Sequence, residues 1–403
     1  MINGHCDDRF KKIYEIFSKQ LKSGHELGCS VAIEYQGKEV VNLYGGYTNK
    51  LKSKEWESNT LVNVWSVTKA VTGICISKII SDGLLDVNKN VNYYWPEYGK
   101  TKSDAKVIDI LTHRAGMFGF KNGFPDCKWT DWDIFVKTLE SQAPYHAPGL
   151  SQGYHALTYG WLVGEIIRRV DGRSVGTYFK EEIAEPFGID FKIGLGDDDL
   201  SRCADILPDP RSESMILKLL PYMPDFLLPD QLKVIKGILK GGDYQVAFQS
   251  FQDQDLTNTK EWRQAEIPSA NGHGTAESLA KLFGILSTGC ERDGKRIFSE
   301  ETLQFCLNPL SKGPDTVLFG AEINIGVGFD LGLGMTTIGQ PGHPESIFGH
   351  CGIGGCVAYG DAENQLGYGF LCNRIHQPQE LYKTSNAITT KLFEIVNKLN
   401  SRN

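Results

Sequence analysis

Several features that would assign a function at once are absent from this sequence. It contains no C-x-x-C and no H-E-x-x-H motif, and its closest cysteine pair, Cys351 and Cys356, has no second pair nearby. A structural zinc site is therefore not expected. Lys and Arg form no cluster and the net charge is −7, which argues against nucleic acid as a partner. No apolar run reaches the length of about 18 residues that spans a bilayer.

The remaining composition is that of an ordinary globular protein. Of the 403 residues, 41% are hydrophobic and 23% are charged, so the chain can fold without disulfides or a metal. The polar stretch from Met1 to Lys12 lacks the apolar core of a signal peptide. The 10 cysteines, spread from Cys6 to Cys372, are typical of buried small residues in a reducing compartment. We therefore expect a cytoplasmic protein.

Hydrophobic spacing predicts strands at both ends of the chain and helices between them. The expected strands are 30–35, 40–44, 326–333, 354–360 and 366–372, and the expected helices are 9–22, 66–80, 107–113, 154–170, 275–286 and 381–399. Gly37 marks the turn of the first hairpin, and Asp361 to Asn364 form the turn between the last two strands. The stretch from Leu207 to Trp262 contains five prolines and is the least regular.

The simplest arrangement of these elements is one sheet built from both chain ends beside a helical insertion. This predicts an α/β (α+β) fold and a single domain, 1–403. Its α/β lobe would comprise about 1–62 and 265–403, and its inserted, mainly helical lobe about 63–264. A cleft would lie between the two lobes, with the proline-rich stretch at its border.

A serine followed three residues later by a lysine can pair a nucleophile with an activating amine, because residues i and i+3 share a helix face. The matches are Ser66 with Lys69, Ser103 with Lys106 and Ser278 with Lys281. Only Ser66 lies at the start of an apolar helix. Burying a lysine in such a helix costs free energy, so its presence there suggests a function. Unpaired N–H groups at such a helix start would also stabilise an oxyanion. On the motif alone, an N-cap serine with a solvated lysine explains the pattern equally well.

A second serine lies in Gly149-Leu-Ser151-Gln-Gly153, which matches the G-x-S-x-G elbow of α/β-hydrolases. That elbow must follow a buried strand, whereas this segment follows Pro144 and Pro148 and reads as a loop. We therefore reject Ser151 as a nucleophile and expect it to cap the helix that begins near Tyr154.

Two further segments could complete a site around Ser66. Tyr154 could act as a general base if neighbouring cations stabilise its phenolate. A tyrosine more often packs its ring in the core, which is what we expect of Tyr159. The glycine-rich stretch Phe348 to Gly355 permits close backbone approach, and an N–H there could complete an oxyanion hole. Taken alone, a β-bulge with a surface histidine explains that stretch better.

Together these pieces resemble the β-lactamase-related serine hydrolases: class C β-lactamases, penicillin-binding D-amino-acid peptidases and family VIII carboxylesterases. The landmarks, in chain order, are WSVTKA at 65–70, LTHRAG at 111–116, YHALTYG at 154–160, AEIPSANGHG at 265–274 and GHCG at 349–352. The esterase branch matches best, through the segments at Tyr154 and Ala265. The resemblance runs from about Ser30 to Tyr368 and implies a β-lactamase/transpeptidase-like fold, an antiparallel sheet flanked by helices.

The resemblance also implies roles for individual residues. Ser66 would be the acylated nucleophile, Lys69 its activating partner and Tyr154 the proton shuttle. The backbone N–H groups of Ser66 and Ile353 would form the oxyanion hole, and His350 and Gly352 would bind substrate.

Two departures from the lactamase and peptidase pattern matter. Ala156 stands where those relatives have the asparagine of Tyr-x-Asn, and His350 stands where they have lysine. Both positions handle the amide and carboxylate of a penicillin-like substrate, so the departures argue against that activity.

The sequence therefore predicts a serine hydrolase that acts through an acyl-enzyme, without cofactor or metal, on a small or short-acyl carboxylic ester. The alternatives are a β-lactamase or D-amino-acid peptidase, an acyltransferase, or a catalytically idle scaffold of the same fold. The intact set of Ser66, Lys69 and Tyr154 argues against the idle scaffold. Nothing in the sequence indicates the oligomeric state.

Overall fold

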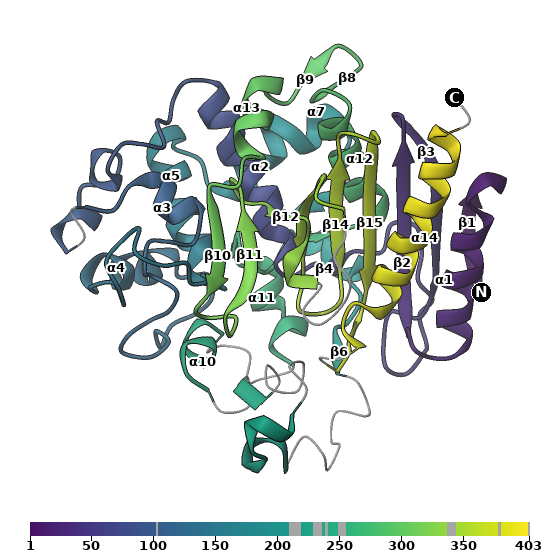
Figure 1. Cartoon of the computed structure of the whole chain (residues 1–403), viewed down its shortest axis with the longest axis horizontal. Helices are drawn as coiled ribbons and strands as arrows, with labels where there is room; N and C mark the ends of the chain where they lie inside the picture. The colour runs from purple at the N-terminus through teal and green to yellow at the C-terminus, as the bar shows by residue number, and fades with distance from the viewer. Residues whose placement is uncertain are drawn as a thin grey trace.

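The computed structural model describes residues 1–101, 104–208, 219–228, 236–237, 241–248, 255–336, 344–377 and 380–401. Among these residues, nine strands form one antiparallel sheet in the order β1-β3-β2-β15-β14-β13-β12-β11-β10 (Figure 1). The strands from the two chain ends meet inside the sheet, where β15 (Leu366–Cys372) pairs with β2 (Gly28–Tyr35). The expected sheet of terminal segments is thus confirmed.

The other strands of the large sheet are β1 (Ile2–Cys6), β3 (Lys38–Gly46), β10 (Ser311–Asp315), β11 (Ala321–Ile325), β12 (Asp330–Leu331), β13 (Ile347–Cys351) and β14 (Val357–Asp361). Small sheets join β4 (Val62–Asn63) and β5 (Phe191–Lys192) to β7 (His273–Gly274), β6 (Leu207–Pro208) to β16 (Arg374–Ile375), and β8 (Glu291–Arg292) to β9 (Lys295–Arg296). The α-helices are α1 (Lys11–Lys22), α2 (Val67–Ser81), α3 (Val107–Leu111), α4 (Trp132–Ser141), α5 (Thr158–Asp171), α6 (Val175–Phe179), α7 (Glu185–Phe187), α10 (Asp243–Ala247), α11 (Lys260–Gln264), α12 (Ala276–Ser287), α13 (Glu300–Cys306) and α14 (Lys383–Asn400).

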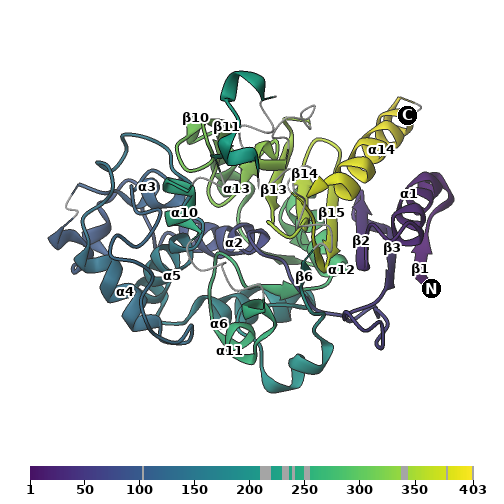
Figure 2. The ribbon, with the colours of Figure 1, turned by 90° about the horizontal axis from the view of Figure 1, so that it is seen from below.

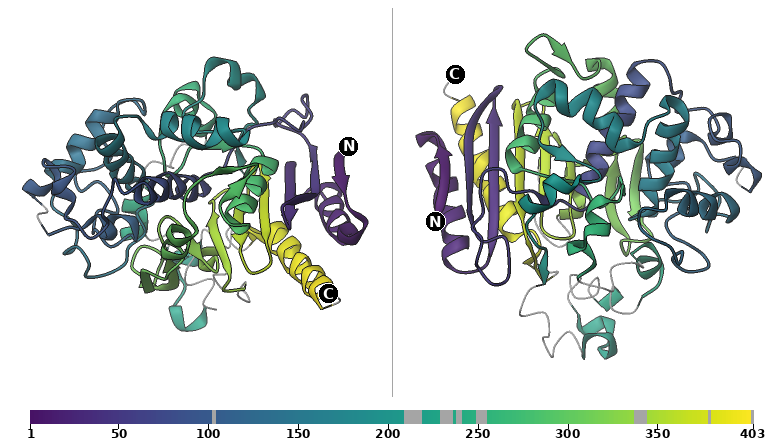
Figure 3. Two further views of the ribbon diagram at one scale, coloured as in Figure 1. Left: turned by 90° about the horizontal axis from the view of Figure 1, so that it is seen from above. Right: turned by 180° about the vertical axis from the view of Figure 1, so that it is seen from behind.

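Helices cover both faces of the sheet. Figures 2 and 3 show α12 on one face and α14 on the other, where α14 packs beside α1. Helix α12 lies so close to β15 that a Cβ at Gly367 would come within 2.0 Å of the carbonyl oxygen of Ala280. On α14, the buried residues Ile388, Leu392 and Val396 recur at helical spacing and face the core.

Helix α2 links the sheet to the remaining helices. It contacts β13 of the sheet as well as α5, α6 and α13, and its residues from Val67 to Ser77 are all buried. Figure 1 shows α3, α4 and α5 gathered on the side of the molecule away from both termini. The N-terminal end of α2, where Ser66 lies, is therefore held inside the molecule. Among the described residues, no helix combines the length and the apolar character that a membrane crossing needs.

Most predicted elements are confirmed, with three corrections and several omissions. Helix α5 begins at Thr158 instead of Tyr154, and β14 begins at Val357 instead of Gly354. Of the strand expected at 326–333, only Asp330–Leu331 is a strand, because Gly328 has a φ of +76° and packs against Gly73 of α2. Among the elements that the sequence did not predict are β1, β10, β11, β13, α4 and α13. Much of the proline-rich stretch 207–262 lies outside the described residues.

Candidate active site

Ser66 occupies the N-cap position of α2, but its side chain does not cap the helix. The preceding residue, Trp65, has a φ of +54°, a left-handed conformation that is rare for a bulky side chain and is often found at functional sites. Ser66 itself is half-buried, so its hydroxyl stays accessible. The backbone thus turns sharply just before the serine and leaves its hydroxyl available for other partners.

Lys69 is completely buried, so the alternative of a solvated lysine is wrong. Its Nζ lies 3.2 Å from Ser66 Oγ and donates to the carbonyl oxygens of Ala156 at 2.6 Å and Ser269 at 2.8 Å. Burial lowers the pKa of Lys69 well below its usual value. A neutral amine has two N–H groups and one lone pair. In the neutral form, with its two N–H groups on the two carbonyls, the lone pair of Lys69 would face the Ser66 hydroxyl.

The carbonyl of Ser269 lies in a loop whose backbone is hydrogen bonded by the side chain of Asn271. Asn271 Nδ2 donates to the carbonyl oxygens of Trp262 and Ala265, and its Oδ1 accepts from the amide of Ile267. These bonds explain why the segment 265–274 belongs to the site: it presents a backbone acceptor to Lys69. Sequence reasoning did not assign this role, since a backbone carbonyl has no residue signature.

Tyr154 completes the group around Ser66. It is buried, and Lys69 Nζ lies 4.9 Å from its ring centroid. Burial raises the pKa of Tyr154 well above its usual value, although the neighbouring Ser66 hydroxyl lowers it. Burial therefore favours a neutral phenol beside a neutral amine in the resting site.

Two residues that the sequence did not single out hold the Tyr154 segment. Asp315 Oδ1 accepts from the amide of Tyr154 at 3.1 Å and from the amides of Val317 and Leu318, each at 2.9 Å. His113, in the second landmark, packs its ring 4.9 Å from that of Tyr154, and its carbonyl accepts from Gly153. These contacts hold in place the segment that precedes α5.

The glycine-rich segment after β13 lies directly against the residues that precede Ser66. A Cβ at Gly352 would come within 2.5 Å of the carbonyl oxygen of Val64, and one at Gly354 within 2.3 Å of Trp65 Nε1. Within the described residues, the amides of Ser66 and Ile353 donate to no protein acceptor. Both remain the predicted oxyanion donors, and the close approach accounts for the glycine at 352.

His350 faces the site from β13, with its ring centroid 6.0 Å from that of Tyr154. Its Nδ1 lies 2.7 Å from the carbonyl oxygen of Cys351 and so must donate to it, which leaves Nε2 with a lone pair. Nε2 is buried and has no protein partner in the described residues. Burial and the nearby Lys69 lower the pKa of His350 to about 3. A neutral imidazole in this tautomer can only accept a hydrogen bond from a substrate.

Among the described residues, Ser151 forms no hydrogen bond with Ser66, Lys69 or Tyr154. The residues directly before it, 142–150, contain no strand, and Leu157, not Ser151, is the N-cap residue of α5, so the expected capping role is wrong. The neighbouring Gln152 instead forms a β-bridge with Asp315. Tyr159 is fully buried on α5, in agreement with its expected place in the core.

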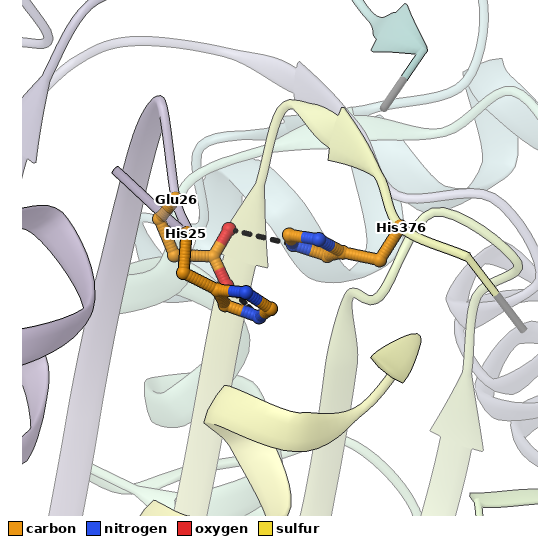
Figure 4. Close-up of side chains that lie close together, drawn as sticks. All are labelled: His25, Glu26 and His376. Carbon is orange, nitrogen blue, oxygen red and sulfur yellow. Dashed lines mark hydrogen bonds and ion pairs between the residues drawn. The ribbon is translucent and has the colours of Figure 1, made fainter. Parts of the chain in front are cut away.

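One cluster brings together three possible metal ligands, away from Ser66. The ligand atoms of His25, Glu26 and His376 all lie within 4.8 Å of one another (Figure 4). The two imidazole rings stack with centroids 4.2 Å apart and 8° between their planes. A bound metal lies in the plane of each imidazole that binds it, so one ion cannot satisfy two stacked rings. His376 and Thr384 bond to Glu26 at 3.0 and 2.6 Å, and the cluster ties the segment before β2 to α14.

The chain is similar in sequence and structure to several known proteins. The family model described as Beta-lactamase matches residues 13–389. A relative described as "Esterase/beta-lactamase LipL", from Mycobacterium tuberculosis, is 28% identical over 399 residues, which cover 98% of this chain and 87% of the relative. A solved family VIII carboxylesterase superposes with a TM-score of 0.81 at 29% identity, covering 96% of this chain and 100% of that one. A penicillin-binding protein homologue from Caulobacter crescentus gives a TM-score of 0.80 at 32% identity, with 96% and 100% covered.

Proposed function

This chain belongs to the Beta-lactamase family, and we propose that it is a serine hydrolase acting through an acyl-enzyme, with small, short-acyl carboxylic esters as its substrates. The observation that carries the proposal is the buried Lys69, whose Nζ lies 3.2 Å from Ser66 Oγ. A buried lysine directed at a half-buried serine is the arrangement of an activated nucleophile.

Acylation begins when Ser66 Oγ attacks the ester carbonyl carbon and its proton passes to Lys69 Nζ. The amides of Ser66 and Ile353 stabilise the negative charge on the carbonyl oxygen. As the tetrahedral intermediate collapses, the bond to the alcohol oxygen breaks and Tyr154 gives that oxygen a proton. Proton transfer from the Lys69 ammonium to the Tyr154 phenolate then returns both groups to neutrality. Water then attacks the acyl-enzyme with the same pair as base and acid.

The site favours a simple ester over a penicillin-like substrate. The Ala156 methyl cannot bond to a side-chain amide, and the His350 Nε2 lone pair repels a carboxylate instead of binding it. Leaving a buried amide unpaired costs about 1–3 kcal/mol, and a lost charged contact costs comparably. A short ester needs neither contact. The similarity to LipL and to a family VIII carboxylesterase supports this choice.

The test compares a short-acyl aryl ester with a chromogenic cephalosporin on the same enzyme. We expect the ester to exceed the cephalosporin in kcat/KM by roughly a hundredfold or more, since each 1.36 kcal/mol is about a factor of ten. Comparable values for the two substrates would overturn the proposal. They would favour the second candidate, a β-lactamase, which the name of the LipL relative also includes.

We also propose a reducing compartment, the cytoplasm, for this enzyme. All ten cysteines are free thiols, and eight of them are buried. Thiols of this kind persist where glutathione and thioredoxin keep them reduced.

A further inference from the structure

A row of aromatic rings begins at Tyr154 and runs away from the nucleophile. The ring of Phe248 lies 6.2 Å from that of Tyr154, and Tyr244 stacks on Phe248 at 4.3 Å with 19° between the planes. Phe319 continues the row, 5.4 Å from Tyr244 and tilted by 26°. Tyr244, Phe248 and Phe319, here called the aromatic row, are each half-buried.

The row is built by two elements from distant parts of the sequence. Tyr244 lies on α10, and Phe248 is the first residue after that helix. Phe319 lies in the turn between β10 and β11. Figure 1 shows α10 next to the lower ends of β10 and β11. Asp315, the last residue of β10, immediately precedes this turn and accepts a hydrogen bond from the amide of Tyr154. The β10–β11 hairpin therefore positions both the Tyr154 backbone and the far end of the row.

The backbone of Phe319 has an unfavourable conformation. Its φ is +58°, in the left-handed region that bulky side chains rarely occupy. Strain of this kind persists where the surrounding structure requires it, and it gathers at ligand-binding and active sites. A strained phenylalanine that extends an aromatic row from the active site points to a role in binding.

The position of Tyr154 indicates which part of a substrate would contact the aromatic row. In the proposed mechanism, Tyr154 protonates the alcohol oxygen as the ester bond breaks, so the alcohol leaves past its hydroxyl. The acyl carbonyl lies on the other side, toward the amides of Ser66 and Ile353. The other groups beside the Tyr154 ring are the polar side chains of Lys69, His113 and His350, so Phe248 begins the apolar surface next to it.

We infer that the aromatic row binds the alcohol portion of the substrate and selects esters whose alcohol carries an aromatic ring. This inference rests on the proposed ester hydrolysis and names its substrate class. Aromatic pairs prefer offset or tilted contacts with centroids about 4.5–7 Å apart, the spacing that the row already shows. An aromatic group next to the ester oxygen would extend the row by one more ring.

The test uses three acetates with similar leaving groups: benzyl, cyclohexylmethyl and ethyl acetate. We expect benzyl acetate to exceed cyclohexylmethyl acetate in kcat/KM by about fivefold or more, within the range measured for aromatic pairs. In Phe248→Leu and Tyr244→Leu, which keep an apolar side chain, the ratio should fall toward one. Gln245→Ala, at an exposed position on the same helix, should keep the wild-type ratio.

The ratio within one enzyme does not depend on how much of a variant is folded. A wild-type ratio near one, or a ratio that Phe248→Leu leaves unchanged, would overturn the inference while leaving ester hydrolysis intact. If the wild type hydrolyses none of the three acetates nor the aryl ester, the proposed function fails instead.

Discussion

Lys69 and Tyr154 share one serine, and burial moves their pKa values in opposite directions. The pKa of the amine is lowered and that of the phenol is raised, so both groups favour the neutral form. A phenol that holds its proton is a poor base, whereas a neutral amine facing Ser66 Oγ is a good one. At the scale of single residues, we therefore propose Lys69 as the first proton acceptor and Tyr154 as the group that returns the proton to the alcohol.

This assignment predicts a specific pH dependence. Lys69 must be unprotonated to accept the serine proton, so kcat/KM should rise with pH through the lowered pKa of Lys69. Tyr154→Phe should keep this acidic limb and lower kcat by about a hundredfold or more, the scale for losing a proton-transfer group. Both effects are measured in pH–rate profiles of ester hydrolysis.

Tyr159→Phe is the matched control for that variant. Tyr159 is buried nearby, and its hydroxyl has no partner within the described residues, so removing it should change kcat little. An acidic limb that disappears in Tyr154→Phe would contradict the assignment, because it would make the tyrosine the titrating base.

At the scale of elements, the oxyanion side of the site depends on how closely two segments approach each other. The loop after β13 packs on Val64 and Trp65, and Gly352 leaves no room for a methyl group 2.5 Å from the Val64 carbonyl. Gly352→Ala should therefore push Ile353 away from Ser66. We expect kcat to fall by about a hundredfold or more, as when an oxyanion donor is lost.

Gly196→Ala serves as the control for this effect. An added Cβ there would meet only the Asp199 carboxylate, at an ordinary 3.7 Å, and the backbone is not left-handed. Activity should stay near the wild-type value. If Gly352→Ala were equally active, the segment 352–354 would not supply the second oxyanion donor.

Elements with a continuous buried stripe were predictable from the sequence, and those without one were not. Helices α1, α2, α12 and α14 and the pair β2–β3 have the expected spacing. Strand β13 is short, and Gly349 and His350 interrupt its apolar residues, so no apolar run marks it. Strand β1 is polar and lies at the sheet edge, so it has no apolar pattern to detect.

The site was predictable where it depends on side chains close in sequence. Ser66 and Lys69 share one helix turn, and the landmark motifs added Tyr154, which the structure brings to the same place. Asp315 and the Ser269 carbonyl were not found, since Lys69 and Ser269 are 200 residues apart and only the fold joins them. The roles of these residues in catalysis remain predictions.

At the scale of the whole molecule, burial of histidines makes stability depend on pH. His113, His155, His273 and His350 are buried, and burial lowers the pKa of each, to about 3 for the last three. Below the unfolded value of about 6.5, the unfolded chain binds protons that the folded chain does not. The free energy of unfolding should therefore fall as the pH decreases from about 6.5 toward 3.

Each imidazole that stays neutral in the folded state lowers the free energy of unfolding by roughly 2 kcal/mol at pH 5 relative to pH 8. Burial raises the pKa of Asp330 to about 7, which acts in the opposite direction. The stability from Asp330 is present below pH 3.8 and is lost as the pH rises through 7. Urea unfolding between pH 8 and pH 4.5 measures the balance, and the midpoint should decrease steadily below about pH 6. A constant midpoint over that range would contradict the burial of neutral histidines.

The central claim for the whole molecule is that Ser66 forms the acyl-enzyme, and a fluorophosphonate probe followed by peptide mass spectrometry tests it most directly. We predict one adduct, on the peptide that contains Ser66, with loss of labelling and ester hydrolysis in a folded Ser66→Ala variant. Ser151→Ala should label and hydrolyse esters like the wild type. An adduct on Ser151, or hydrolysis that survives Ser66→Ala, would contradict the account.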